Sequence, residues 1–147
     1  MEKNEEGFTL VEVLIVLGCL TLMLTIASAV TSKMFETYEQ QAFLNQLEKD
    51  IYYAQVYAME NNTYVLLRFV TDQNEYSAYS YKTNSHIIST QKAESIKFKK
   101  VGNVPITYIP AGNIQNPTTI YLTDKNGKTI YKLVFQLGRG RFYIAEV

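Results

Sequence analysis

The chain has 147 residues, of which 14 are basic and 14 acidic, with one cysteine and one histidine. This length suits one modest soluble domain with one appendage, and a single cysteine excludes an intrachain disulfide. The lone histidine leaves no histidine pair for a metal, and the sequence has no phosphate-binding glycine loop and no paired-carboxylate motif. Composition and motifs therefore predict a protein that is not an enzyme and holds neither cofactor nor metal.

The first element in chain order is an apolar run. Residues 8–30 are 23 positions with a single charge, Glu12. A helix of that length spans roughly 34 Å, which is enough for a bilayer core. We therefore expect a membrane helix at 8–30, preceded by a short hydrophilic leader at 1–7. A buried core helix is one alternative, and a secretory signal peptide cut near Ala27-Ser28-Ala29 is another.

Glu12 is the unusual residue of this run. A lone carboxylate in hydrocarbon costs on the order of 3 kcal/mol or more, so such an acid is expected to have a partner. Cleavage after Gly7 would create an amino group on Phe8, four residues from Glu12, and the two groups could neutralise each other within one chain or between neighbours. The alternative is that Glu12 lies near the membrane interface and reaches water.

The segment Gly7-Phe8-Thr9-Leu10-Val11-Glu12, which follows a short hydrophilic leader, resembles the class III signal of type IV prepilins and pseudopilins. The resemblance implies that a prepilin peptidase cuts after Gly7 and methylates the new amino group on Phe8. It also implies that Glu12 pairs with the N-terminus of an adjacent subunit during filament assembly. The implied partners are the peptidase, other major and minor pilins, the membrane, and the assembly ATPase with its platform.

Two departures from the family pattern bear on the type of subunit. The leader carries Lys3 against three glutamates, so it is less basic than family leaders. The apolar helix contains no proline, and Gly18 is its only potential breaker. The missing proline fits a minor component of a filament at least as well as a major subunit.

A second helical pattern occupies residues 31–62. Its apolar residues recur at a spacing of three and four, which makes one stripe along a helix. The stripe consists of Leu44, Leu47, Ile51, Ala54 and Ala58. We expect a sheet to pack on this stripe, with a coiled coil as the alternative, and we expect Asn61-Asn62 to end the helix.

From residue 63 to residue 147 the pattern is typical of strands. Strands are expected at 63–70, 75–82, 87–91, 95–101, 106–109, 119–123, 129–137 and 141–146. Asn126-Gly127 predicts a tight hairpin between two of them. A long helix followed by an antiparallel sheet is an α+β arrangement, and this order matches the pilin fold.

The ending Gly138-Arg139-Gly140, which precedes the last expected strand, resembles minor pseudopilins of type II secretion and competence systems. With the absence of head cysteines, it favours a minor pseudopilin of a competence (DNA-uptake) pilus at the cell surface. A type II secretion pseudopilin is the second hypothesis. A single-pass membrane protein with a ligand-binding ectodomain is the third.

The C-terminal part of the sequence is basic, and its basic residues define a candidate polyanion contact for a partner such as DNA. The candidate residues are Lys97, Lys99, Lys100, Lys128, Lys132, Arg139 and Arg141. The alternative is an ordinary solvated face over tyrosines that are buried in the core. His86 is expected in a polar turn, and Asp124-Lys125-Asn126-Gly127 has only the start of a calcium-loop pattern.

Overall fold

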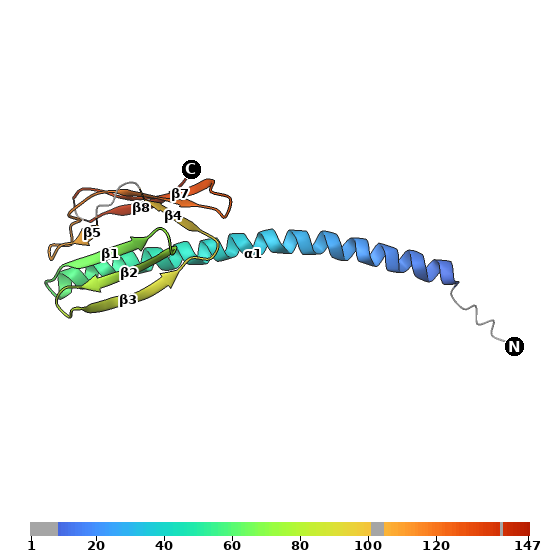
Figure 1. The fold of residues 1–147 in the computed structure, drawn as a ribbon, viewed down its shortest axis with the longest axis horizontal. Helices are drawn as coiled ribbons and strands as arrows, with labels where there is room; N and C mark the ends of the chain where they lie inside the picture. The colour runs from blue at the N-terminus through green and yellow to red at the C-terminus, as the bar shows by residue number, and fades with distance from the viewer. Residues whose placement is uncertain (1–8, 101–104, 139) are drawn as a thin grey trace. The chain divides into compact units, whose positions relative to one another are not determined.

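The computed structural model describes residues 9–100, 105–138 and 140–147, with side chains for all of these except 27–33 and Lys100. The helix α1 (Leu10–Glu60) comes first (Figure 1). The strands are β1 (Val65–Val70), β2 (Glu75–Ser80), β3 (Ser85–Lys92), β4 (Lys97–Lys100), β5 (Ile106–Tyr108), β6 (Thr119–Thr123), β7 (Thr129–Phe135) and β8 (Phe142–Glu146). The chain divides into two compact units, Met1–Tyr38 and a head formed by Glu39–Val147.

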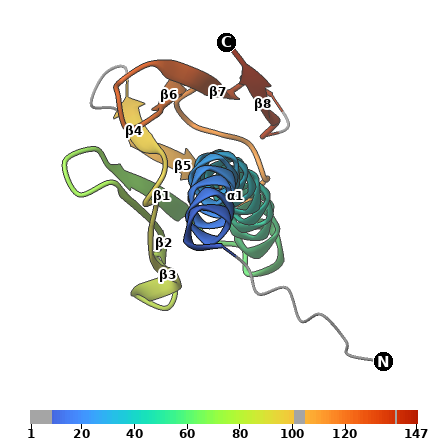
Figure 2. The ribbon, with the colours of Figure 1, turned by 90° about the vertical axis from the view of Figure 1, so that its right-hand side faces the viewer.

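The head contains two antiparallel sheets. The first sheet has the order β3-β2-β1-β5 and the second has the order β4-β6-β7-β8. In Figure 2 the strands β1–β3 lie along one side of the helix and β6–β8 along another. The expected α+β class, with a long helix followed by antiparallel strands, is therefore confirmed.

Each expected strand coincides with an observed one, with small differences at the ends. The clearest difference is β3, which begins at Ser85, so that His86 pairs with Tyr79 inside a strand and does not lie in the expected turn. The turn that precedes β3 ends at Asn84, because Asn84 adopts φ 54° and reverses the chain there. His86 remains exposed, as expected.

The helix ends where the two asparagines were expected to end it. Asn62 has φ 49°, and the N–H of Thr63 donates to the carbonyl of Ala58 at 3.0 Å. The N–H of Asn62 donates to the carbonyl of Met59 at 3.3 Å. This pair of bonds is the Schellman arrangement, which satisfies carbonyls that the last helical turn leaves open.

The apolar stripe of α1 is the inner surface of the head. Leu47, Ile51, Ala54 and Ala58 have no exposed surface, and Leu44 is 5% exposed. All five belong to one core cluster with side chains from both sheets. Burying a leucine or isoleucine side chain stabilises a fold by about 1.5–3 kcal/mol. The sheet-packing interpretation of the stripe is therefore confirmed over the coiled coil.

Asn74, in the turn between β1 and β2, joins the two sheets. Its Nδ2 donates to the carbonyls of Ala93 and Ile96, and its Oδ1 accepts from the N–H of Phe98 at 2.9 Å. Phe98 lies on β4, in the second sheet, whereas Asn74 adjoins the first. Asn74 also has φ 57°, a left-handed conformation that asparagine adopts more easily than most residues.

The turn before β8 packs tightly against the helix. A side chain at Gly140, where φ is 61°, would overlap the carbonyl oxygen of Gly112 and the side-chain amide of Gln55. That amide donates to the Gly112 carbonyl at 2.9 Å. The Tyr108 hydroxyl donates to the Gly140 carbonyl at 3.3 Å. Glycine is required here for contact between α1 and the last turn.

Two buried tyrosines carry strongly raised pKa values. Burial, together with a 2.6 Å hydrogen bond to the Asp50 carboxylate, raises the pKa of Tyr76 far above its ordinary value of 10.0. Burial, with a smaller effect from Tyr52, also raises the pKa of Tyr108. Both side chains stay neutral in the folded head at pH values that ionise an exposed tyrosine.

We predict that Asn74→Gly destabilises the head by about 2–4 kcal/mol, because three side-chain hydrogen bonds are removed while the left-handed conformation stays accessible. Asn62→Gly is the matched control, since Asn62 is an exposed left-handed asparagine at the helix end. Urea denaturation followed by circular dichroism measures both. Equal stability of the two variants would contradict the role of the Asn74 side chain.

We also predict that the free energy of unfolding falls as pH rises above about 10, because the unfolded tyrosines ionise there and the folded ones do not. Below that pH the contribution is fully present, and it is lost as pH rises toward the raised pKa values of the folded state. Tyr108→Phe should make the loss between pH 9 and pH 11 smaller by up to about 1.4 kcal/mol per pH unit. Urea denaturation across that window tests this, and an unchanged pH dependence in Tyr108→Phe would be inconsistent with it.

Candidate functional site

The helix α1 starts at a capping residue that belongs to the N-terminal motif. The hydroxyl of Thr9 accepts the backbone N–H of Glu12 at 3.3 Å, and the Thr9 carbonyl accepts the N–H of Val13 at 3.2 Å. Threonine at the cap and glutamate three residues later form the capping-box pattern. Thr9 therefore fixes the residue at which the helix begins and places Glu12 in its first turn.

Glu12 is exposed at the positive end of the helix. A negative side chain in the first turn is stabilised by the helix dipole, typically by about 0.3–1 kcal/mol at an exposed site. The residues that lie beside Glu12 on the same surface of the helix are apolar, namely Val13, Val16, Leu17 and Leu20. The helix thus presents one carboxylate within an apolar surface.

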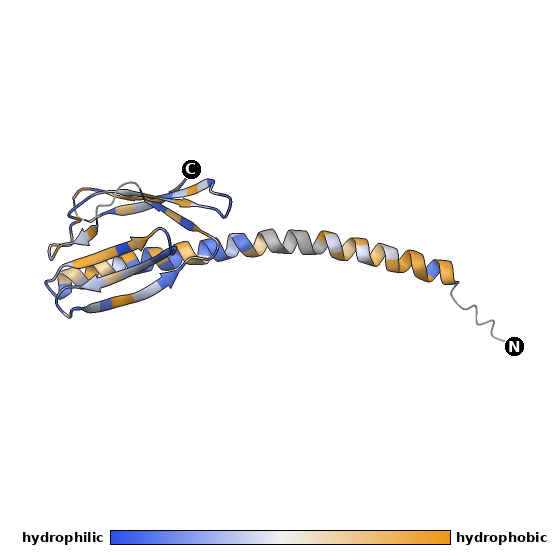
Figure 3. Ribbon diagram, in the orientation of Figure 1, coloured by the Kyte–Doolittle hydropathy of each residue, from blue (hydrophilic) through white to orange (hydrophobic). Residues whose placement is uncertain are grey.

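The large apolar side chains between Leu10 and Ile26 are exposed on all sides of the helix. Their exposed fractions run from 46% at Val13 to 79% at Leu10. Figure 3 shows this part of α1 in orange apart from a few paler or blue positions. Such an extended apolar surface is far larger than a soluble monomer normally presents, and it marks a surface that contacts lipid or another protein.

Within the described residues, no helix combines the length and the apolar character that crossing a bilayer requires. Phe8 and the side chains of residues 27–33 lie outside the description. The membrane helix expected over residues 8–30 stays a prediction. Gly7 and Phe8, at the expected cleavage site, also lie outside the described residues.

A second candidate surface is the outer face of the sheet β4-β6-β7-β8. Lys99 pairs with Tyr121, and Tyr121 pairs with Lys132, so the three residues form one row across three strands. Their strand neighbours Phe98 and Leu133 are buried on the opposite side. This alternation leaves the basic row facing away from the core.

The other basic residues predicted for the polyanion contact either are exposed near this row or have side chains outside the described residues. Lys97 is exposed on β4, and its Nζ donates to the carbonyl of Lys125 at 3.1 Å. Lys128, in the β6–β7 turn, and Arg141, next to β8, are exposed. The side chains of Lys100 and Arg139 lie outside the described residues.

The single carboxylate of the turn between β6 and β7, on Asp124, has a structural role. Asp124 Oδ1 accepts the N–H groups of Asn126 at 2.9 Å and Lys128 at 2.8 Å. Gly127 adopts φ 84°, which completes the expected hairpin. No group of three metal-binding side chains occurs among the residues that the structure describes.

The capping role of Thr9 is absent from the expectations above, although a threonine three residues before a glutamate is a sufficient sequence signal for it. The same residues also match a cleavage and charge-pairing motif, so this short segment carries two overlapping signals. No comparable sequence signal exists for the row of Lys99, Tyr121 and Lys132, because this row depends on the register of three strands.

Residues 3–28 match the model of the prokaryotic N-terminal methylation motif. The chain resembles the minor pseudopilin EpsH from the Type 2 Secretion System of Vibrio cholerae, with a TM-score of 0.60 and 9% sequence identity. The likeness covers 74% of this chain and 97% of the EpsH chain, and at that identity it establishes the fold alone. A search of curated proteins found no match. The chain therefore carries a prepilin-type methylation motif at its N-terminus and has the fold of a minor pseudopilin.

Proposed function

We propose that the chain is a minor pseudopilin of a competence (DNA-uptake) pilus and that its role is structural rather than enzymatic. The observation that carries the pilin-like role is one carboxylate, Glu12, in the first turn of a helical segment, Leu10–Ile26, whose large apolar side chains are exposed. A lone helix of this kind needs an apolar environment, either lipid or the helices of other subunits. The subunit would wait in the membrane with its head outside and then enter a filament that reaches the cell surface.

The assembly step follows from the charge of Glu12. Removal of residues 1–7 by a prepilin peptidase would leave a positive amine on Phe8, directly before the Thr9 cap. In a filament core that amine and the Glu12 carboxylate of a neighbouring subunit would neutralise each other in a low-dielectric environment, where an unpaired charge is costly. A subunit in the wrong register would leave both charges unpaired, so the pair selects the register.

The assignment to a DNA-uptake system is supported by the outer face of the sheet β4-β6-β7-β8. Lysines alternate there with a tyrosine, and two further exposed residues are Arg141, directly before β8, and Tyr143, on β8. Cationic side chains attract phosphates, and tyrosine rings can stack on bases. The second candidate is a type II secretion pseudopilin, which the structural likeness to EpsH favours. A transformation assay on a deletion strain separates the two candidates, since only the competence pseudopilin predicts that transformation is lost.

We predict that Glu12→Gln is shortened by residues 1–7 like the unmodified chain but is absent from purified filaments. Glutamine keeps the capping-box position, so the variant removes the charge while the start of the helix is preserved. Mass spectrometry of membrane and filament fractions measures both steps. Gly7→Leu is the control and should stay at full length. Normal incorporation of Glu12→Gln would disprove the pairing mechanism.

We predict salt-dependent binding of duplex DNA by the full chain in nonionic detergent. Lys99→Gln/Lys132→Gln should reduce the slope of log K against log salt by about 0.9 for each phosphate that the variant no longer neutralises. Lys49→Gln/Lys92→Gln removes the same charge from α1 and β3 and should change the slope less. Fluorescence anisotropy with a labelled duplex gives the slopes. Identical slopes for the two double variants would show that binding does not use this face.

A further inference from the structure

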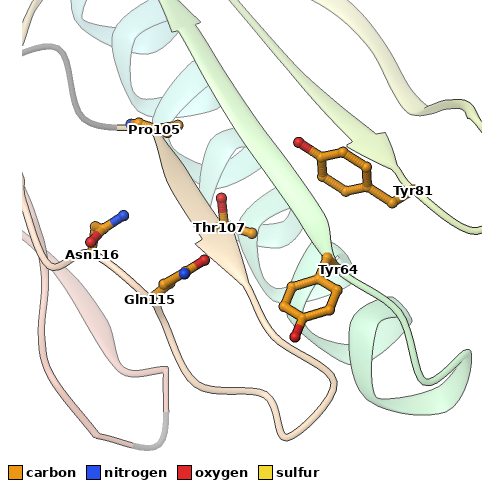
Figure 4. Close-up of a pocket in the computed structure, with 6 residues that line it drawn as sticks. All are labelled: Tyr64, Tyr81, Pro105, Thr107, Gln115 and Asn116. Atoms are coloured by element: carbon orange, nitrogen blue, oxygen red, sulfur yellow. The ribbon is translucent and has the colours of Figure 1, made fainter.

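A pocket of about 480 Å³ opens on the side of the sheet β3-β2-β1-β5 that faces away from the core. Val65 and Tyr108 point into the core and have no exposed surface, and the neighbouring residues Tyr64 and Thr107 line the pocket. This is the alternation of a strand with one buried face. Figure 4 shows the rings of Tyr64 and Tyr81 on one side of the pocket, the amides of Gln115 and Asn116 on the other, and Thr107 between them.

The two tyrosines are paired through their backbones, and their rings are open to solvent. The N–H of Tyr81 donates to the carbonyl of Tyr64 at 3.1 Å, which extends the β1–β2 ladder by one pair. Tyr64 is 49% exposed and Tyr81 is 57% exposed. The ring of Tyr81 also meets the ring of Tyr79 edge to face, with centroids 5.7 Å apart. The backbone bond places the two tyrosines side by side, and the ring of Tyr79 packs against that of Tyr81.

The polar side of the pocket offers uncommitted hydrogen-bonding groups. The N–H of Gln115 donates to the carbonyl of Thr107 at 2.9 Å, which places Gln115 beside β5. Within the part of the chain that the structure describes, the side-chain polar atoms of Thr107, Gln115 and Asn116 make no hydrogen bond to the protein. A hydroxyl and two amides can together donate and accept several hydrogen bonds to a ligand.

The described residues that line the pocket carry no formal charge: they are Tyr64, Tyr81, Pro105, Thr107, Gln115 and Asn116. A nucleic acid draws most of its affinity from cations near its phosphates, and no cation is among these described residues. A purely apolar ligand would leave the two amides without partners, which costs binding energy. A sugar ring has an apolar face for an aromatic ring and hydroxyls for amides, and the volume lies within the range of small-molecule sites.

We propose that this pocket binds one or two units of a neutral glycan, with Tyr64 and Tyr81 against the sugar faces and Gln115, Asn116 and Thr107 bonded to hydroxyl or acetamido groups. The site is separate in sequence and in sheet from the basic row of Lys99, Tyr121 and Lys132. It does not depend on the proposed function. A pilin-like subunit of any system could use it to contact a polysaccharide.

Isothermal titration of the full chain with a tetramer of N-acetylglucosamine and with maltotetraose tests the site. The micelles should be of a polyoxyethylene detergent, because detergents with sugar head groups would compete. We expect saturable binding of at least one of the two sugars. Tyr81→Ala removes an aromatic surface and should decrease the affinity for that sugar about tenfold. Tyr81→Phe keeps the ring and should retain most of the affinity.

Tyr53→Ala is the matched control, because Tyr53 is an exposed tyrosine on α1, outside both proposed surfaces, and it should bind like the unmodified chain. Thermal unfolding of each variant checks that the head is intact. The proposal is overturned if neither tetramer binds saturably, or if Tyr53→Ala and Tyr81→Ala weaken binding equally. It is also overturned if an eight-residue oligodeoxythymidine displaces the sugar, since the pocket would then take a nucleic acid. None of these results bears on cleavage after Gly7 or on filament entry.

Discussion

The head depends on the packing of one helical stripe against two sheets at once. Leu47, Ile51 and Ala54 are fully buried, and they share a core with strand residues from both sheets. A helix with a single apolar face normally packs against one sheet. Here a second sheet packs against the same face, which requires further contacts to hold it there. The alanines of the stripe contribute here, since small side chains let strands approach the helix axis more closely than leucines would.

The polar contacts at the ends of the sheets close this arrangement. Asn74 links the turn after β1 to the segment that enters β4, and Gln55 and Tyr108 fasten the loop at Gly112 and the turn at Gly140. Each joins parts of the chain that are far apart in sequence, and each satisfies backbone groups that the core could not leave unpaired. The chain has one cysteine, so these bonds take the place that disulfides have in many small extracellular domains.

Periodic features of this fold could be predicted from the sequence, and contacts that depend on register could not. The stripe of α1, the asparagines that end the helix and the strand segments all follow from local patterns, and the structure contains each of them. The three bonds of the Asn74 side chain could not be inferred, because Asp72-Gln73-Asn74 is typical of an ordinary turn whichever segment lies beside it. The pocket at Tyr64 and Tyr81 could not be inferred for the same reason: Gln115 joins it only through the pairing beside β5. Strand alternation alone, by contrast, predicts that Lys97 and Lys99 lie on one side of their strand and Phe98 on the other.

The distribution of charge over the head suits the two sheets to different kinds of ligand. The chain as a whole is neutral, so a basic face on β4 and β7 must be matched by acidic residues elsewhere, and α1 carries several of them. A neutral pocket on the first sheet therefore lies on the same small domain as a cationic row on the second. A ligand that depends on phosphate charge would bind the cationic row, and a ligand that depends on stacking and amide hydrogen bonds would bind the pocket. The two kinds of ligand would therefore not compete for one site. Glu12 is a third separate surface: its described neighbours on the helix are apolar, and Thr9 caps the turn that presents its charge. Local chemistry at each surface, rather than the net charge of the protein, decides what it can bind.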